Sequence, residues 1–435
     1  MKKSKECLKR AKNHMPLGVA DSYRYWGEEN TVFVDRMEGY GFTDVDGKEY
    51  VDFRLGYGPI ILGYRDRRID EKVSEALFRK GNMCGFSVEE ESDVAEAIKR
   101  LCPQIEKLRF ANSGTEAVLG AVRTARGFTN RHRTVVVEGG FHGLYDEMMW
   151  KFNVDEWDAE AQKEPDIIPF GAGLARHSNQ FVELVPLNDL AALERVFQTY
   201  KNEIAGVVIE PIMGNCGSIA ATKGYMEGLK KTCKENGALL IVDEVKTGFR
   251  VAKGGAQELY KVYADLTTYA KAMGNGYAIA AFGGRADIMD KIHFAQDGVV
   301  HGGTYTANLV GLFAAKATLE VLEKTDALKT IEKVGENIKT VLSEVFTAYD
   351  IEHTFQGHPS MFGVHFTKEA PIDYRSWKQT NAKLYEKFAW NLIEQGIMLE
   401  PDSREPWFLC EAHKHLDLSV LKGKAMKAMN KAVTS

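Results

Sequence analysis

Two charged residues that follow strand-like runs constrain the fold of this chain more than any other feature. The apolar run at 238–242 ends at Asp243, and the shorter run at 267–270 is followed directly by Lys271. A carboxylate at the end of a buried strand is costly unless it meets a cation. A lysine at the end of the next strand, beside glycines, can reach the same cleft as an amine nucleophile. The pair therefore predicts neighbouring strands that open onto one site.

Strand-like and helix-like segments alternate through the middle of the chain, which is typical of a mostly parallel sheet covered by helices. The pattern predicts helices at 115–128 and 224–236. It predicts strands at 108–110, 134–137, 205–209, 238–242, 267–270 and 280–283.

The two ends of the chain follow a different pattern. Asp46-Gly47, flanked by alternating residues at 41–45 and 50–53, predicts a β-hairpin. After about residue 310, long amphipathic helices at 314–322 and 327–349 precede a strand-like run at 361–366. We expect residues 61–310 to form a large α/β domain. Residues 1–60 and 311–435 would then meet in a smaller α+β domain.

Asp243 and Lys271 together suit pyridoxal 5′-phosphate as a cofactor. This cofactor needs a lysine for its aldehyde and an acid that keeps its ring nitrogen protonated. Taken alone, either residue would favour a structural ion pair or a lysine that reaches solvent. With both in place, the freed amine of Lys271 would act as general base and acid, provided that burial or a neighbouring cation lowers its pKa.

The sequences around these two residues resemble a known signature. DEVKTGFR at 243–250 and LTTYAKAMGNG at 266–276 are similar to segments of the class III aminotransferases. The resemblance implies a fold-type I pyridoxal phosphate-dependent transferase with a Lys271 Schiff base and a mostly parallel central sheet flanked by helices. It also implies a homodimer with shared active sites.

The run NSGTEA at 112–117 lies between an expected strand and an expected helix. Free N–H groups and the positive end of a helix favour a phosphate dianion at such a position. Gly114 lets the backbone approach closely, and Thr115 adds a hydroxyl next to Ser113. An ordinary capped helix start is the alternative. The same phrase occurs in the aminotransferase family at this point, which favours a phosphate site.

Two further runs resemble family elements that surround the cofactor. In GGFHG at 139–143, Phe141 matches the aromatic residue that stacks on the pyridine ring. His142 would lie beside the ring, or serve as a hydrogen-bonding residue of the core. Val245 would pack on the opposite face of the ring. Glu210 matches a glutamate near the 3-oxygen of the cofactor or near a substrate-switching arginine, and Asn215 would lie close by.

The run GGTYTAN at 302–308 resembles the family segment whose threonine reaches the phosphate bound by the neighbouring subunit. The resemblance therefore implies that Thr304 completes the active site of a partner in the dimer. Ala307 and Leu309 depart from the residues common in relatives, which alters the expected loop geometry.

Within the family, residues 15–415 are most similar in pattern to the glutamate-1-semialdehyde 2,1-aminomutase branch. There an arginine in the segment that matches 18–24 binds the substrate carboxylate, which implicates Arg24. Tyr57 would line the pocket where that branch has tryptophan, and Glu405 falls near an acidic position of the same pocket.

Departures from that branch affect the substrate pocket rather than the cofactor machinery. Residues 148–170 are acidic and aromatic where the branch has a glycine- and serine-rich gating loop, and Lys246 replaces an apolar residue. These changes favour a two-substrate aminotransferase that acts on a carboxylate-bearing amino compound, such as a β- or ω-amino acid, with a keto acid or aldehyde as acceptor. Intramolecular amino transfer of the aminomutase type is the alternative.

The composition excludes several other classes of partner. A net charge of −5 gives no general attraction to nucleic acid or to anionic membranes, and no apolar run approaches the length of a membrane span. The cysteines are scattered without a CxxC pair, which predicts reduced thiols in a cytoplasmic protein and no metal site. They are Cys7, Cys84, Cys102, Cys216, Cys233 and Cys410.

Overall fold

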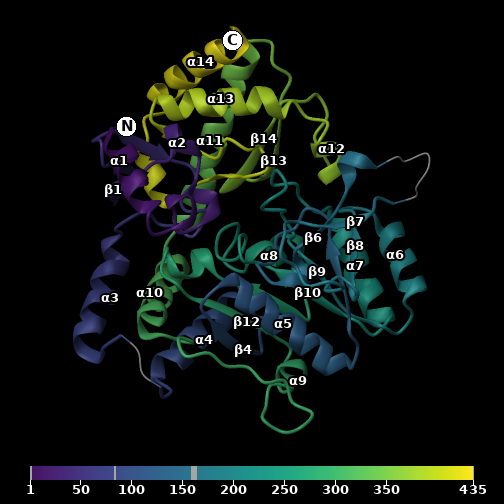
Figure 1. Ribbon diagram of the computed structural model, residues 1–435. Helices are drawn as coiled ribbons and strands as arrows, with labels where there is room; N and C mark the ends of the chain where they lie inside the picture. The colour runs from purple at the N-terminus through teal and green to yellow at the C-terminus, as the bar shows by residue number, and fades with distance from the viewer. Residues whose placement is uncertain (1, 83–84, 158–163, 435) are drawn as a thin grey trace.

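A seven-stranded sheet forms the centre of the larger lobe of the computed structural model, which describes residues 2–82, 85–157 and 164–434 (Figure 1). β12 runs against its neighbours β11 and β4, and the remaining pairs are parallel. The spatial order is β4 (Lys107–Ala111), β12 (Ala280–Gly284), β11 (Leu266–Tyr269), β10 (Leu239–Asp243), β9 (Ile204–Ile209), β5 (Arg133–Val137) and β8 (Val182–Val185).

Helices pack on both faces of this sheet because alternate residues of each strand point to opposite sides. Val135 and Val137 of β5 pack in one apolar cluster with residues of α6 and α7, whereas Val136 packs in another with residues of α5. The helices of this lobe are α3 (Arg67–Lys80), α4 (Glu89–Leu101), α5 (Gly114–Thr129), α6 (Leu190–Thr199), α7 (Lys223–Glu235), α8 (Gly255–Tyr260), α9 (Ala286–Met289) and α10 (Leu309–Lys324).

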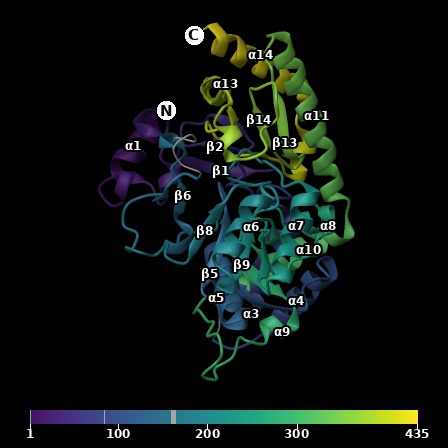
Figure 2. The same ribbon diagram turned by 90° about the vertical axis from the view of Figure 1, so that its right-hand side faces the viewer.

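The smaller lobe contains both ends of the chain, which lie at the same end of the molecule in Figures 1 and 2. Its first sheet contains β1 (Val34–Glu38), β2 (Gly41–Asp44), β3 (Glu49–Asp52) and β15 (Ile397–Met398), and its second contains β13 (Thr354–His358), β14 (Met361–His365) and β16 (Trp407–Phe408). Its helices are α1 (Lys2–Ala11), α2 (Gly27–Asn30), α11 (Ala327–Ala348), α12 (Tyr374–Trp377), α13 (Ala382–Glu394) and α14 (Leu418–Thr434).

The pairing of β15 with β3 ties the two chain ends together. The strands are parallel, with Ile397 opposite Val51 and Met398 opposite Asp52. The expected hairpin connects β2 to β3 through Gly47, whose φ of 89° suits glycine. The N-terminal segment therefore depends on residues almost 350 positions later for its sheet.

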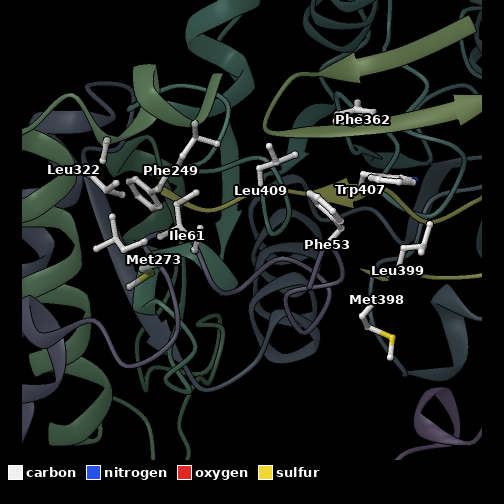
Figure 3. Close-up of a cluster of buried hydrophobic side chains, with 14 of the residues drawn as sticks. Phe53, Ile61, Phe249, Met273, Leu322, Phe362, Met398, Leu399, Trp407 and Leu409 are labelled. Atoms are coloured by element: carbon white, nitrogen blue, oxygen red, sulfur yellow. The ribbon is translucent and has the colours of Figure 1, made fainter. Parts of the chain in front are cut away.

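One apolar core continues from the larger lobe into the smaller lobe (Figure 3). Phe249 and Met273 contribute from the sheet side, and Phe53 and Trp407 contribute from the small-lobe side. Trp407 is fully buried and its indole N–H donates a hydrogen bond to the hydroxyl of Tyr385 at 3.0 Å. Burial on this scale is the main force that holds the lobes against each other.

The structure confirms the α/β class and the mostly parallel sheet. It adds β8, α6 and a two-stranded ribbon of β6 (Trp150–Phe152) and β7 (Ile167–Pro169), which the sequence pattern did not predict. The domain division at residues 60 and 310 stays a prediction, and Cys84 and residues 158–163 lie outside the described residues. No helix of the described residues is long and apolar enough to cross a membrane.

Candidate active site

Asp243 and Lys271 lie at the carboxyl ends of two neighbouring parallel strands. Asp243 is the last residue of β10 and pairs in register with Thr268 of β11. β11 ends at Tyr269, and Lys271 begins the short 3-10 turn η5 (Lys271–Gly274). Both side chains line one cavity of about 150 Å³. The strand register thus brings together the two residues that the sequence singled out.

Asp243 is buried, and its carboxylate oxygens have three partners in the protein. Oδ2 lies 2.8 Å from Nδ1 of His142, and Oδ1 accepts hydrogen bonds from the Thr268 hydroxyl at 2.9 Å and the Val245 N–H at 3.0 Å. Burial disfavours a charged imidazole, but the hydrogen bond and negative charge of Asp243 outweigh it. The pKa of His142 is therefore raised above 6.5.

Lys271 combines an unusual backbone with an unusual amine. Its φ of 47° falls in the left-handed region, which residues other than glycine adopt rarely and often at functional sites. Removal from water and then the nearby ammonium of Lys246 lower the pKa of Lys271 to about 7, although carboxylates, with Glu210 first, oppose the shift. An amine with this pKa is neutral in a large fraction of molecules at neutral pH, as a nucleophile or base must be.

Helix α5 begins at the same cavity. The side chain of Ser113 caps it by accepting a hydrogen bond from the Glu116 N–H at 3.2 Å. Gly114 and Thr115 line the cavity, and a Cβ on Gly114 would lie 3.0 Å from Cγ1 of Val245. The absence of a side chain at Gly114 therefore leaves room for Val245 beside the helix start, where free N–H groups favour an anion. Ser113 itself is exposed and does not line the cavity.

These residues fit pyridoxal 5′-phosphate. The cavity offers an amine at Lys271, an acid at Asp243 and an anion-favouring helix start at Gly114. Phe141 and Val245, expected on opposite faces of the ring, both line it. Nε2 of His142 is buried and has no hydrogen-bond partner within the described residues, so the cavity also contains an unpaired polar atom.

Glu210 connects the loop before Phe141 to the loop after β9. Its Oε1 accepts a hydrogen bond from the Phe141 N–H at 2.9 Å, and its Oε2 accepts one from the Gly214 N–H at 3.0 Å. Burial raises the pKa of Glu210 above its ordinary value, against the opposing charge of Lys246. Glu210 thus fixes the position of the aromatic residue that lines the cavity.

Lys246 is buried in the wall of the cofactor cavity. Its ammonium donates hydrogen bonds to the carbonyl oxygen of Gly214 and to Oδ1 of Asn215, both at 2.6 Å, and to Oε2 of Glu405 at 3.2 Å. Asn215 in turn donates from Nδ2 to Oε1 of Glu405 at 2.5 Å. Asn215 and Glu405 were predicted from separate parts of the sequence, and they form one hydrogen-bonded network with Lys246. The sequence comparison had noted Lys246 only as a difference from the aminomutase branch.

A second cavity of about 160 Å³ adjoins the first, and Phe141 lines both. Tyr57, Asn215 and Glu405 line it, together with Arg404. Side chains from the segment 148–170 form another part of its wall. They are Met148, Met149, Trp150, Lys151, Phe152 and Phe170. The second cavity therefore has the position and the lining expected of a substrate pocket.

Arg24 does not line either cavity. It ends the 3-10 turn η2 (Ser22–Arg24) and is exposed, whereas its neighbour Tyr23 lines the second cavity. The role of Arg24 in binding a substrate carboxylate stays a prediction, since its side chain is not part of the wall of either cavity. Thr304 is exposed too and lines neither cavity of its own chain, so its expected role depends on a second subunit.

Several charged residues near the second cavity were not predicted from the sequence. Arg54 donates from Nε to Oε2 of Glu400 at 2.8 Å and contacts the hydroxyl of Tyr57. Glu400 and Arg404 belong to the charged stretch 400–405 between the apolar runs 397–399 and 406–410, and such a stretch is a usable signal. No group of three metal-ligating His, Cys, Asp or Glu side chains occurs in the part of the chain that the structure describes.

Comparison of the sequence with known protein families shows the family to which the chain belongs. The model for aminotransferase class-III matches residues 23–412. The chain belongs to the class-III aminotransferase family. It is thus a pyridoxal 5′-phosphate-dependent enzyme that acts on small molecules. Among similar proteins, a glutamate-1-semialdehyde 2,1-aminomutase from Methanothrix thermoacetophila is 36% identical over 94% of this chain and 92% of its own. One from Aquifex aeolicus is 34% identical over 95% and 96%.

Solved structures agree with this family assignment. An omega-transaminase from Sphaerobacter thermophilus superposes with a TM-score of 0.91 at 26% identity, covering 99% of this chain and 98% of that one. A glutamate-1-semialdehyde aminomutase from Pseudomonas aeruginosa gives a TM-score of 0.87 at 21% identity, covering 99% and 95%, which is a likeness of fold. A transaminase with pyridoxal phosphate bound gives 0.88 at 25% identity, covering 100% and 98%.

Proposed function

We propose that this class-III enzyme moves an amino group within one small carboxylate-bearing compound, as a glutamate-1-semialdehyde 2,1-aminomutase does. The observation that carries the chemistry is the convergence of Lys271 and Asp243 on one cavity at the start of α5. The aminomutase names of the curated relatives, which align with nearly the whole chain, support the intramolecular reaction. They favour it over the two-substrate reaction that the departures in the sequence suggested.

Each residue of the site would have its own role in this reaction. Bound at Lys271, the cofactor would supply an electron sink for the carbon that loses its proton. The neutral amine of Lys271 would then carry that proton between carbon atoms as base and acid. Asp243, oriented by His142, would hold the ring nitrogen. Thr115 and the first turn of α5 would bind the phosphate, a role in which Ser113 and Gly114 assist through the helix start.

Two-substrate amino transfer is the second candidate, and a specific observation favours it. The pocket wall from residues 148–152 and Phe170 is bulky and aromatic, and the structural relatives include an omega-transaminase and a beta-phenylalanine aminotransferase, each at 26% identity. A β- or ω-amino acid as donor, with a keto acid or aldehyde as acceptor, would suit such a pocket. Tyr57 and Glu405 would contact the substrate in either reaction.

One experiment separates the two reactions and tests the shared chemistry. The purified holoenzyme is incubated with glutamate-1-semialdehyde without any acceptor, and in parallel with β- and ω-amino acids plus pyruvate or 2-oxoglutarate. We expect 5-aminolevulinate from the first reaction and no activity in Lys271→Ala. Product only in the presence of a keto acid would replace the intramolecular reaction with the second candidate. Turnover by Lys271→Ala would contradict both.

We also propose that the enzyme works as a homodimer in the cytoplasm. Exposed large apolar side chains in the segment 294–305, namely Phe294, Val300 and Tyr305, support an interface around Thr304. Five cysteines of the described residues are free thiols, which suits a reducing compartment. They are Cys7, Cys102, Cys216, Cys233 and Cys410.

A further inference from the structure

Lys246 has an environment that a purely structural lysine seldom has. Its side chain is 5% exposed, yet it lines the cofactor cavity beside Lys271. An ammonium group has three N–H donors, and Lys246 uses all three, on Gly214, Asn215 and Glu405. One acceptor is a carboxylate and two are neutral, so Glu405 is the only hydrogen-bonded counter-charge, while the carboxylate of Glu210 interacts with Lys246 through space.

The three contacts of Lys246 differ in length and in origin. The two bonds of 2.6 Å go to Gly214 and Asn215, which belong to the loop after β9 in the same lobe. The contact of 3.2 Å goes to Glu405, which belongs to the loop before β16 in the smaller lobe. The contact with Glu405 is the longest of the three and the one that joins Lys246 to the smaller lobe, and its exchange also frees the Nδ2 donor of Asn215 from Oε1 of Glu405.

Lys246 also marks the boundary between the two cavities. It lines the cofactor cavity, whereas Asn215 and Glu405 line the substrate pocket. A substrate that extends from the reacting carbon into the pocket must pass this network. Lys271, Glu210 and Glu405 are charged groups close to Lys246, and the ring of Phe408 lies 5.8 Å from its ammonium.

We propose that the ammonium of Lys246 binds the carboxylate of the substrate, and that Glu405 forms an ion pair with this ammonium when no substrate is present. The inference rests on the proposed amino transfer, because it assigns the group that holds the substrate of that reaction. A substrate carboxylate takes the N–H that Glu405 releases, so the buried ammonium never loses its counter-charge. The displaced side chain can turn toward Arg404, its neighbour in the loop, which lines the same pocket.

This exchange explains how the enzyme binds a carboxylate although Arg24 lies outside the pocket. It also makes a prediction that a structural ion pair does not make. If Lys246 and Glu405 only stabilise the fold, removal of either one leaves the other charge buried, and both changes weaken ligand binding. If Glu405 competes with the substrate, the two changes act in opposite directions.

The test measures binding of an inert carboxylate by calorimetry on the holoenzyme. Glutarate serves as the probe and glutaramide, its uncharged diamide, as the matched control ligand. We expect Lys246→Met to weaken glutarate binding by roughly tenfold or more, the effect of losing one hydrogen bond to a charged group. We expect Glu405→Gln to tighten it by roughly threefold or more. Glutaramide should bind poorly to all variants.

Two further variants complete the design. The double variant with Lys246→Met and Glu405→Gln should bind glutarate as weakly as Lys246→Met alone. Without the ammonium of Lys246, Glu405 and glutarate no longer compete for the same group. Lys230→Met removes a cation that pairs at 2.7 Å with the buried Asp265. Asp265 lies at the amino end of β11, opposite the end that leads to Lys271, so glutarate binding should stay unchanged. This variant controls for loss of a partly buried charge as such.

The outcomes separate this inference from the proposed function. Weaker glutarate binding in both single variants, or unchanged binding in Lys246→Met, overturns the carboxylate site while the Lys271-dependent absorbance of the bound cofactor persists. Absence of that absorbance in the wild-type holoenzyme would instead refute the amino transfer itself. Opposite shifts in the two single variants, with no further change in the double variant, support the exchange.

Discussion

The amine of Lys271 is the residue-scale feature with the clearest measurable consequence. Burial and the charge of Lys246 lower the pKa of Lys271 to about 7. The neutral amine attacks the aldehyde of pyridoxal 5′-phosphate, and the protonated amine does not. The rate at which cofactor-free enzyme captures the cofactor should therefore rise with pH through about 7 and then level off, as followed by visible absorbance. A rate that keeps rising to the ordinary lysine pKa would contradict this environment.

Individual residues show where sequence reasoning succeeds and where it stops. Asp243 and Lys271 could be paired from sequence because each ends a strand-like run of the same sheet. The partner of Asp243 was harder to predict, because His142 lies 101 positions away and nothing local links them. Arg24 was expected in the pocket, but a tight turn places Tyr23 there instead. In such a turn, a shift of one residue changes which side chain faces the site.

The start of α5 is the element whose shape most directly serves the cofactor. A Cβ at Gly114 would approach Val245 to 3.0 Å, and Val245 is the residue expected against the ring. We therefore expect Gly114→Ala to weaken cofactor binding roughly tenfold by displacing Val245, measured by absorbance titration. Gly423→Ala is the matched control, since no atom lies within 4 Å of its added Cβ in α14. It should leave cofactor affinity unchanged and add about 0.5–1 kcal/mol of stability.

Elements differed in how far the sequence specified them. β5, β9 and β10 each contain a run of at least three apolar residues because helices cover both faces of the sheet, so their positions were predictable. The reversed direction of β12 was not, because strand direction depends on the path of the connecting loop rather than on the composition of the strand. β15 has only two residues and pairs with β3 from the other end of the chain, so no local pattern reveals it.

Arg250 holds the two lobes together at the scale of the whole molecule. It is fully buried, and its guanidinium donates to four backbone carbonyl oxygens, those of Gly58, Ile60, Ser360 and Leu409. A lysine cannot reproduce this fork, so some carbonyls would lose their partners. We expect Arg250→Lys to lower the free energy of unfolding by about 2–4 kcal/mol in denaturant titration. A loss below about 0.5 kcal/mol would show that the fork is dispensable.

The last prediction concerns the assembly. If Thr304 completes the phosphate site of a partner, Thr304→Ala should weaken cofactor binding by roughly fivefold to tenfold without changing the molecular mass in solution, because one hydroxyl is lost and the interface remains. Light scattering should give twice the mass of one chain for both proteins.

Phe294→Asp places a charge at a 92% exposed apolar position in the segment 294–305. It should shift the mass in solution toward that of the monomer and weaken cofactor binding in parallel. A monomeric wild-type protein with full cofactor affinity would exclude a shared site, since Thr304 does not line the cavity of its own chain.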